Sequence, residues 1–248
     1  MIHLLGLLGY PLGHSFSQKY FNQKFENEGL TNYKYELFEL PQIELLPQLI
    51  ASQPNLRGFN VTIPYKEKIL TYLDELDTFA EKIKAVNVVK ILSNGKKIGY
   101  NSDYYGFLQS LKNTNWNLTG KKALILGTGG SAKAVRVALQ ILGIEYQHVS
   151  TRYHNAQNLQ YSHLNEEILA DYQLIINTTP LGMHPHSNLC PAIPYQLLTP
   201  AHYCFDLVYN PEKTLFLQKA ESQGAKIKNG LEMLYLQAEK SWEIWTQD

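Results

Sequence analysis

Hydrophobic and polar positions along the first hundred residues follow two alternating periods. Apolar or alternating runs at 2–9, 33–40 and 56–63 predict three β-strands. Helical spacing at 17–29, 41–52 and 65–83 predicts a helix after each strand, although Pro47 interrupts the second of them. We expect Ser17 to cap the first helix and Gly29 to end it. The segment 85–103 predicts a hairpin with its turn at Asn94-Gly95, so this part of the chain is an α/β lobe.

A different pattern begins near Tyr105. The run 121–127 is almost continuously apolar, which is typical of a strand covered on both faces of a parallel sheet. A helix follows at 128–143, and further short strands follow at 146–151, 173–179 and 202–209. This alternation predicts a doubly wound α/β domain. The last amphipathic helix follows Gly230 and is able to pack on either lobe.

Composition narrows the function to small-molecule chemistry. The 248 residues carry 22 basic and 22 acidic side chains without a run of one sign, so a nucleic-acid or anionic-membrane surface has no support. Two cysteines, Cys190 and Cys204, form neither a disulfide framework nor a CxxC site. The apolar start of the chain lacks a basic flank and is too short to span a bilayer, and we therefore expect a cytoplasmic protein.

A glycine-rich turn follows the strand at 121–127. Its residues, Gly127-Thr128-Gly129-Gly130-Ser131-Ala132, fit the pattern G-x-G-x-x-[G/A] between a strand and a helix. Gly127 would make the tight turn, Gly129 would let backbone amides approach a pyrophosphate, and Ala132 would allow close helix–strand packing. The alternative is a structural turn that binds nothing. Because motif and context agree, we interpret it as a dinucleotide site.

The end of the next strand bears on the choice of nucleotide. Sites for NAD place a carboxylate there to hold the ribose hydroxyls. Here the chain reads Ser150, Thr151 and Arg152, without an acidic residue. An arginine pairs well with a 2′-phosphate, so NADP is favoured, the alternative being a solvated loop arginine.

Small polar residues gather where the N-terminal strands end, which is where ligands bind in open α/β sheets. They are His14, Ser15, Ser17, Asn60, Thr62, Lys66, Asn87, Asn101 and Asp103. Each has a structural alternative: Ser17 or Asp103 can cap a helix, Asn87 can pair with backbone, and Lys66 can be a surface charge. Together they offer hydroxyl, amide, amine and carboxylate groups suited to a polyhydroxylated small molecule.

Eight ordered segments carry a family resemblance. They read "GYPLGHSFS", "GFNVTIPYK", "AVNVV", "GYNSDYYGF", "LGTGGSAKA", "NTTPLGM", "FDLVYNP" and "GLEMLYLQAEKSW", and they run from about residue 9 to residue 242. In order and number they resemble the shikimate dehydrogenase family. The resemblance implies a substrate lobe at 1–103 joined by the helix 230–248, and a Rossmann-type NADP lobe at 104–229. It also implies reversible NADPH-dependent reduction of 3-dehydroshikimate to shikimate, in aromatic amino-acid biosynthesis.

The resemblance assigns roles position by position. Ser15 and Ser17 match the serines that bind the substrate carboxylate. The residues that match those holding the ring hydroxyls or lining the substrate cleft are Asn60, Thr62, Asn87, Asp103, Tyr209 and Gln237. Lys66 and Asp103 match the catalytic pair, and Lys66, like Asp103, is also expected to bind the substrate. The cofactor-binding positions are Gly127, Gly129, Gly130, Ala132, Arg152, Thr178, Leu207, Gly230 and Met233.

Several positions depart from the family pattern. Gln18 and Phe21 replace the usual proline and histidine, and Ser102 replaces a threonine. These changes spare the groups expected to contact the substrate. The arginine segment reads Thr151-Arg152-Tyr153 instead of Asn-Arg-Thr, which weakens the inference of strict NADP preference. The chain is also somewhat short for the family.

Reduction of a ring ketone needs a hydride on carbon and a proton on oxygen. Lys66 is the expected proton donor, and Asp103 is expected to orient the substrate and the lysine. Three alternatives stay open. A paralogue could use NAD, quinate or another ring acid, and a regulator could bind nucleotide without catalysis. The loop residues His184, His186 and Cys190 resemble metal ligands, but Pro185 and the lack of a fourth ligand argue against a site. We expect no metal, a small-molecule partner, and a monomer or homodimer.

Overall fold

The computed structural model describes residues 2–13, 15–151 and 158–247. The chain divides into two compact units, Met1–Ser102 with Ala238–Asp248, and Asp103–Gln237. The last helix, α8 (Leu231–Thr246), contributes residues to both units. The sequence predicts that the substrate domain ends after residue 103 and the cofactor domain after residue 229, and these functional boundaries stay a prediction. The contacts divide the chain after Ser102 and after Gln237.

The first unit contains a mixed six-stranded sheet in the order β2-β1-β3-β5-β6-β4. Its strands are β1 (His3–Gly9), β2 (Tyr33–Glu39), β3 (Gly58–Val61), β4 (Glu75–Leu76), β5 (Val88–Ile91) and β6 (Lys97–Tyr100). β1 pairs in parallel with β2 and β3, whereas β3, β5 and β6 pair antiparallel. The predicted hairpin is confirmed, and Gly95 at its turn has a φ of 83°, which favours glycine.

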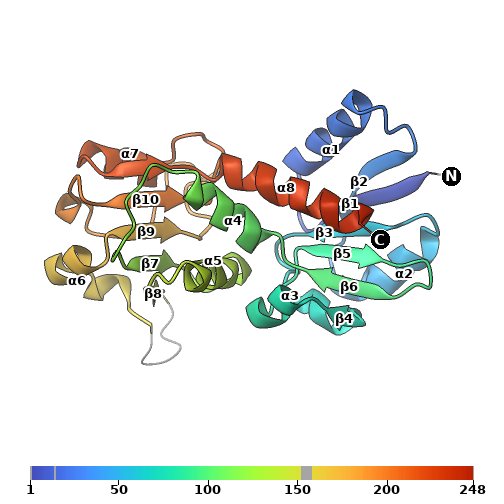
Figure 1. The fold of residues 1–248 in the computed structure, drawn as a ribbon, viewed down its shortest axis with the longest axis horizontal. Coiled ribbons are helices and arrows are strands. Elements are labelled where there is room, and N and C mark those ends of the chain that lie inside the picture. The colour runs from blue at the N-terminus through green and yellow to red at the C-terminus, as the bar shows by residue number, and fades with distance from the viewer. Residues whose placement is uncertain (1, 14, 152–157, 248) are drawn as a thin grey trace. The chain divides into compact units, whose positions relative to one another are not determined.

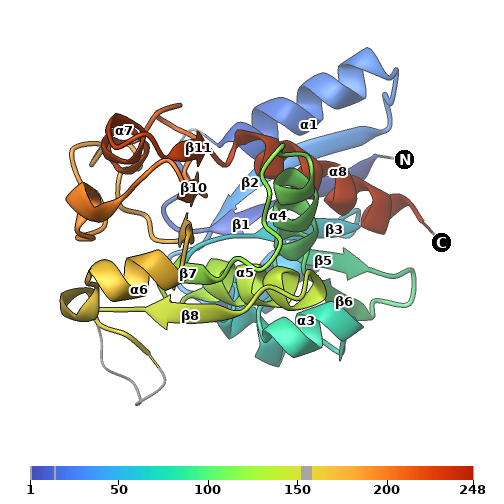
Figure 2. The same cartoon turned by 60° about the vertical axis from the view of Figure 1, so that its left-hand side comes forward.

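Helices cover both faces of this sheet. They are α1 (Phe16–Asn27), α2 (Leu46–Ser52), α3 (Thr78–Ile83) and the 3₁₀ helices Ile43–Leu45 and Lys68–Tyr72. α1 covers one face (Figure 2). There, Phe21 and Phe25 of α1 pack with Leu5 and Tyr35 of the strands and with the end of α8. The other face buries a separate cluster with α2 and α3. Apolar residues at alternate strand positions therefore serve two cores.

Two local predictions in this unit are wrong. The segment 65–83 is not one helix, because β4 pairs with β6 in its middle and Asp77 caps α3 by accepting from the Phe79 and Ala80 amides. Ser17 lies inside α1, and Ser15 occupies the N-cap position instead. Gly29 does follow the end of α1 with a φ of 66°, as expected for a helix stop.

The second unit is built on a parallel five-stranded sheet in the order β11-β10-β9-β7-β8. Its strands are β7 (Ala123–Leu126), β8 (Tyr146–Val149), β9 (Leu174–Asn177), β10 (Tyr203–Asp206) and β11 (Lys226–Lys228). Its helices are α4 (Asp103–Lys112), α5 (Gly130–Ile141), α6 (Glu166–Asp171), α7 (Leu215–Ser222), the start of α8, and the 3₁₀ helices Tyr161–His163 and Tyr195–Leu197. Strand β11 was not predicted, because three residues are too few for a pattern.

The two faces of this parallel sheet have different helical covers (Figure 1). α4, α5 and Met233 pack with Ala123 and Ile125 of β7 on one face. α6 and α7 pack with Leu124 and Leu126 of the same strand on the other. Every residue of β7 is therefore buried, which explains its continuous apolar run. The predicted doubly wound α/β domain is confirmed.

Candidate substrate and dinucleotide sites

The glycine-rich turn lies between β7 and α5, where the sequence placed it. Gly127 has a φ of 113°, and a Cβ there would lie 2.8 Å from the Thr178 hydroxyl, so no other residue fits without strain. Gly129 is exposed, and a Cβ on it would meet open space. Ala132 is fully buried against the sheet. The fold itself therefore requires glycine at position 127. At position 129 the fold would accept a larger residue, and only a ligand that approaches the backbone would require glycine there.

This turn fits a dinucleotide pyrophosphate. Gly130 opens α5, and the first turn of that helix contains no acidic residue, so its amide dipoles favour an anion. The His148 ring lies 3.0 Å from the Gly127 carbonyl oxygen, and burial lowers the pKa of His148. At the end of β8, Ser150 is buried and Thr151 is exposed, and neither carries a charge. Arg152 lies outside the described residues, so its pairing with a 2′-phosphate stays a prediction.

The other predicted cofactor residues belong to the same unit. Thr178 donates to the Leu126 carbonyl at 2.6 Å, at the carboxyl end of β7. A Cβ on Gly230 would lie 2.1 Å from the Leu207 carbonyl oxygen, so the chain at Gly230 touches the loop after β10. Met233 is buried in the α4–α5 core. Thr178 and Leu207 thus follow neighbouring strands, at the sheet edge where α/β proteins bind nucleotides.

A buried carboxylate holds the loops around Leu207. Asp206 is fully buried and accepts hydrogen bonds from the Asn177 amide (2.9 Å), the Val208 backbone N–H (3.0 Å) and the Thr214 hydroxyl (2.5 Å). These three donors come from β9, the loop after β10 and the N-cap of α7. Burial raises the pKa of Asp206 to about 6, although the three hydrogen bonds oppose the rise.

In the first unit, a buried hydrogen-bond network joins strand ends to α8. The Tyr35 hydroxyl donates to Asn60 Oδ1 at 2.8 Å, and Asn60 Nδ2 donates to Ser241 Oγ at 3.0 Å. Ser241 Oγ lies 3.1 Å from Ser102 Oγ, which accepts from Asn87 Nδ2 at 3.0 Å. All five residues are buried, so each polar group needs a partner inside the protein. The network fixes Asn60 and Asn87 relative to each other.

Asn60 is the most constrained of the predicted substrate residues. Its amide nitrogen also donates to the Asn87 carbonyl at 3.1 Å, so both of its N–H groups serve the protein. Asn87 Oδ1 in turn accepts from the Ser102 backbone N–H at 2.6 Å. A direct contact of Asn60 with substrate stays a prediction and would use the oxygen that Tyr35 already contacts.

The remaining candidates in this unit are more accessible. Ser15, Ser17, Thr62 and Lys66 are all partly exposed. The Ser17 side chain is hydrogen-bonded to the buried Tyr35 phenol, whose pKa burial raises well above its ordinary value. The backbone of Lys66 is fixed, because its carbonyl accepts from the Val86 N–H at 2.7 Å.

Asp103, Gln237 and Tyr209 fall in the second unit. Asp103 is buried at the first position of α4, and Gln237 on α8 is partly exposed with its amide donating to the Leu234 carbonyl at 3.0 Å. Tyr209 is half-buried, and burial raises its pKa. The catalytic pair that the resemblance implies, Lys66 and Asp103, therefore comes from different units, and its geometry stays a prediction.

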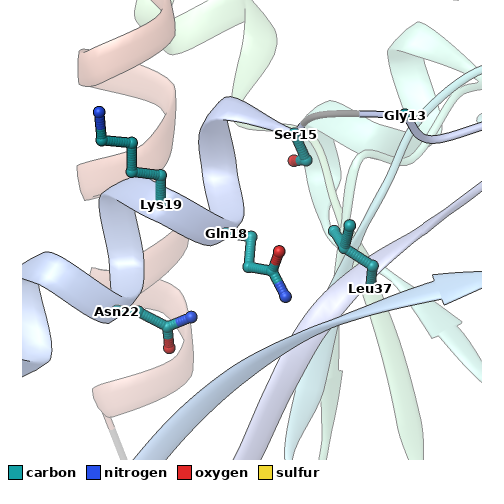
Figure 3. Close-up of a pocket in the computed structure, with 6 residues that line it drawn as sticks. All are labelled: Gly13, Ser15, Gln18, Lys19, Asn22 and Leu37. Atoms are coloured by element: carbon teal, nitrogen blue, oxygen red, sulfur yellow. The ribbon is translucent and has the colours of Figure 1, made fainter.

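One hollow of about 460 Å³ lies between α1 and the edge strand β2. Its lining residues are Gly13, Ser15, Gln18, Lys19, Asn22 and Leu37. Gln18 and Asn22 point toward the strands, whereas Lys19 points away from them (Figure 3). The Asn22 amide pairs with both the N–H and the carbonyl of Tyr35, each at 3.1 Å, and so covers the open edge of β2. Among the predicted substrate residues, Ser15 contributes to this hollow.

Sequence reasoning missed Tyr35, Ser241 and the Asp206 network. Tyr35 occupies an inward position of an alternating strand, where an aromatic residue is ordinarily core. Ser241 follows Ala238 by three residues on the buried side of α8. A polar residue on the apolar face of an amphipathic helix could have indicated a buried hydrogen bond. The side-chain partners of Asp206, Asn177 and Thr214, lie 29 and 8 residues away in sequence, so only the fold brings them together.

Over residues 2–13, 15–151 and 158–247, no helix is long and apolar enough to cross a membrane. Within the same ranges, no group of three or more His, Cys, Asp or Glu side chains is placed to hold a metal ion.

The second unit has a parallel sheet with a glycine-rich turn, and the first unit carries a buried polar cluster around Asn60 and Asn87. Together they define a two-unit α/β nucleotide-binding protein. The profile described as "Shikimate dehydrogenase substrate binding domain" matches residues 7–89. The shikimate dehydrogenase (NADP(+)) of Carboxydothermus hydrogenoformans is 41% identical over 98% of this chain and 91% of its own length. The chain belongs to the shikimate dehydrogenase family.

Solved structures agree with this assignment. Shikimate 5-dehydrogenase from Thermus thermophilus, in complex with NADP(H) and shikimate, matches 99% of this chain and 94% of its own. The TM-score is 0.87 at 32% identity. Quinate dehydrogenase from Corynebacterium glutamicum, in complex with NAD, also gives a TM-score of 0.87, at 26% identity, with 99% of this chain and 94% of its own covered. Both matches span the two units.

Proposed function

We propose that this chain catalyses the reversible NADPH-dependent reduction of 3-dehydroshikimate to shikimate, in the cytoplasm, as a monomer or homodimer. The observation that carries the proposal is the 41% identity to an NADP-dependent shikimate dehydrogenase over 98% of the chain. The match extends through both the polar cluster of the first unit and the glycine-rich turn of the second. Neither unit alone would support a redox reaction on a polyhydroxylated acid.

The substrate is held mainly by hydroxyl and amide groups, together with the Asp103 carboxylate. Ser15 and Ser17 are assigned to its carboxylate, since both lie at the start of α1, where the helix dipole favours an anion. The groups assigned to the ring hydroxyls or the cleft around them are Asn60, Thr62, Asn87, Asp103, Tyr209 and Gln237. Neutral donors suit a carboxylate that must be released after each turnover, because a buried ion pair would hold it more tightly.

NADPH supplies the hydride when it is bound. The Lys66 ammonium donates a proton to the oxygen of the forming hydroxyl, and the neutral amine takes it back in the reverse direction. Asp103 orients that hydroxyl as an acceptor. The rigid backbone at Lys66, fixed by the Val86 N–H, limits where its amine can reach. Proton transfer by one positioned side chain contributes about 10² to 10⁴ in rate.

The second unit is assigned to the cofactor. Gly127, Gly129, Gly130 and Ala132 form the pyrophosphate site, and Arg152 is assigned to the 2′-phosphate. The residues assigned to the nicotinamide end are Thr178, Leu207, Gly230 and Met233. The open space at Gly129 and the uncharged end of β8 support a phosphorylated dinucleotide, because no carboxylate at Ser150 or Thr151 would repel the phosphate.

Steady-state oxidation with four substrate pairs tests the proposal. Shikimate and quinate are each combined with NADP⁺ and NAD⁺, and the formation of reduced nucleotide is followed by absorbance. We expect kcat/KM to be highest for shikimate with NADP⁺. A preference for quinate with NAD⁺ would favour a second candidate function, an NAD-dependent quinate dehydrogenase. The TM-score of 0.87 to quinate dehydrogenase supports that candidate. No turnover with any pair would overturn the enzymatic assignment.

A further inference from the structure

Helices α4 and α8 approach each other closely at Gly106 within the second unit. A Cβ built on Gly106 would lie 2.6 Å from the Met233 carbonyl oxygen, 3.0 Å from Gln237 Cβ and 3.1 Å from the Gln237 nitrogen. The first distance is shorter than real Cβ contacts allow, and the atom it meets is backbone that cannot rotate away. Glycine is disfavoured inside a helix relative to alanine. The close approach of the two helices therefore accounts for glycine at this position.

The contact lies beside two of the assigned substrate residues. Asp103 precedes Gly106 by three residues on α4, and Gln237 follows Met233 by four residues on α8. Residues three or four apart share a helix face, so Asp103 and Gln237 lie on the faces that meet at Gly106. Ser110, four residues after Gly106, donates to Glu232 of α8 at 3.2 Å, which confirms that this face of α4 looks toward α8.

A second contact fixes the helix pair on the other side of Gly106. Glu232 accepts from Asn113 at 2.6 Å and from Ser110, and it forms an ion pair with Lys228. Ser110 and Asn113 follow Gly106 on α4, whereas Asp103 precedes it. A larger side chain at Gly106 would push α4 and α8 apart. The Glu232 contacts hold the two helices together at one end, so the helices would separate at the end that carries Asp103.

We propose that Gly106 is a positioning residue that sets the spacing between Asp103 and Gln237 for the substrate ring hydroxyls. This inference rests on the proposed function. Asp103 offers a hydrogen-bond acceptor and Gln237 offers both a donor and an acceptor, so the pair matches two hydroxyls on one ring only at a fixed separation. The residue does not touch substrate and acts through the helix crossing.

The Gly106→Ala variant tests the spacing. Restoring an ordinary contact moves the helices apart by about 0.6 to 0.8 Å, and misplacement of about 1 Å costs about 10²-fold in rate. Scaled to this displacement, we expect kcat/KM for shikimate to fall about 15- to 40-fold through both a higher KM and a lower kcat. The Kd for NADP⁺, measured by fluorescence titration, should change by less than the shikimate KM. Met233 at the assigned nicotinamide end lies at this crossing, but the glycine-rich turn assigned to the pyrophosphate does not.

Ser110→Ala is the matched control on the same helix face. It removes a hydrogen bond to Glu232 without adding volume, so it should lower the melting temperature and leave the shikimate KM within about twofold. A purely structural role for Gly106 would lower the active fraction and leave the shikimate KM unchanged. A folded Gly106→Ala protein with wild-type KM and kcat for shikimate would overturn the inference.

A second variant covers the case in which Gly106→Ala does not fold. Gln237→Asn shortens the side chain by one methylene at an unchanged crossing, and it should raise the shikimate KM about tenfold or more. A wild-type KM in that variant would also overturn the inference. Failure of the proposed function is distinguishable, since the wild-type protein itself would then not oxidise shikimate with NADP⁺.

Discussion

The buried carboxylate of Asp206 should make this protein more stable at mildly acidic pH than at neutral pH. Its side chain is fully buried, and its only described hydrogen-bond donors are neutral. Burial raises the pKa of Asp206 from 3.8 to about 6 in the folded chain. The folded state therefore holds the proton more tightly than the unfolded state. The contribution is fully present below about pH 3.8 and is lost as pH rises through about 6.

The magnitude follows from the shift. A rise of about 2 pKa units corresponds to about 3 kcal/mol at its limit. Between pH 7 and pH 4.5, the same linkage gives about 2 kcal/mol of added stability. The titratable neighbours that interact with Asp206 are Tyr195 and Cys204, and burial raises the pKa of each, so both stay neutral in this range. With a urea slope of about 2 kcal/mol/M, the midpoint should rise by about 1 M from this group alone.

The Asp206→Asn variant isolates this effect. It keeps the shape of the side chain and an oxygen for Asn177 and Val208, while the Thr214 hydroxyl can rotate to accept. Urea midpoints are measured from pH 4.5 to pH 7 for the wild type and the variant. The urea midpoint of the variant should lack the rise of about 1 M that Asp206 gives the wild type between pH 7 and pH 4.5. The same pH dependence in both proteins would show that Asp206 is not the group responsible.

Other carboxylates titrate in the same range, so a control is needed. Asp171, an exposed residue of the same unit, pairs with Lys122 at 2.9 Å. The Asp171→Asn variant should keep the wild-type dependence on pH, because an exposed ion pair contributes little to stability.

Three further predictions concern the proposed sites. Lys66→Met should lower kcat by about 10² to 10⁴, with the shikimate Kd from calorimetry within a few-fold, and near-normal kcat would contradict its role. Tyr35→Phe removes the hydroxyl that donates to the buried Asn60 Oδ1. It should therefore lower the free energy of urea unfolding by about 1 to 3 kcal/mol and raise the shikimate KM. Tyr195→Phe, which removes the phenol's bond to a backbone carbonyl in the other unit, should leave that KM unchanged. Gly129→Ala should weaken NADP⁺ binding at least tenfold with no loss of melting temperature, whereas Gly127→Ala should also lower the melting temperature.

The parts of the fold that depend on periodicity could be predicted from sequence. The continuous run at 121–127 indicated a strand buried on both faces, and the structure buries all of Ala123–Leu126. The segment 65–83 could not be predicted in this way, because its helical spacing spans a tertiary pairing between β4 and β6. Pairing with a distant strand outweighs a local preference for helix.

The candidate sites divide in a similar manner. The glycine-rich turn could be located because its conformation is local and requires glycine at 127. The commitment of the Asn60 amide to Asn87 and Ser241 could not be read from sequence, because the partners lie 27 and 181 residues away. The same is true of Gly106, whose requirement comes from the Met233 backbone on a different helix.

Transfer of a labelled hydride distinguishes the proposed reduction of 3-dehydroshikimate from nucleotide binding alone. The purified protein is incubated with 3-dehydroshikimate and NADPH carrying deuterium at the transferable C4 position, and the products are analysed by mass spectrometry. The proposed reaction yields shikimate that contains one deuterium, formed in equal amount to NADP⁺. Unchanged 3-dehydroshikimate, or consumption of NADPH without deuterium in the product, would contradict it.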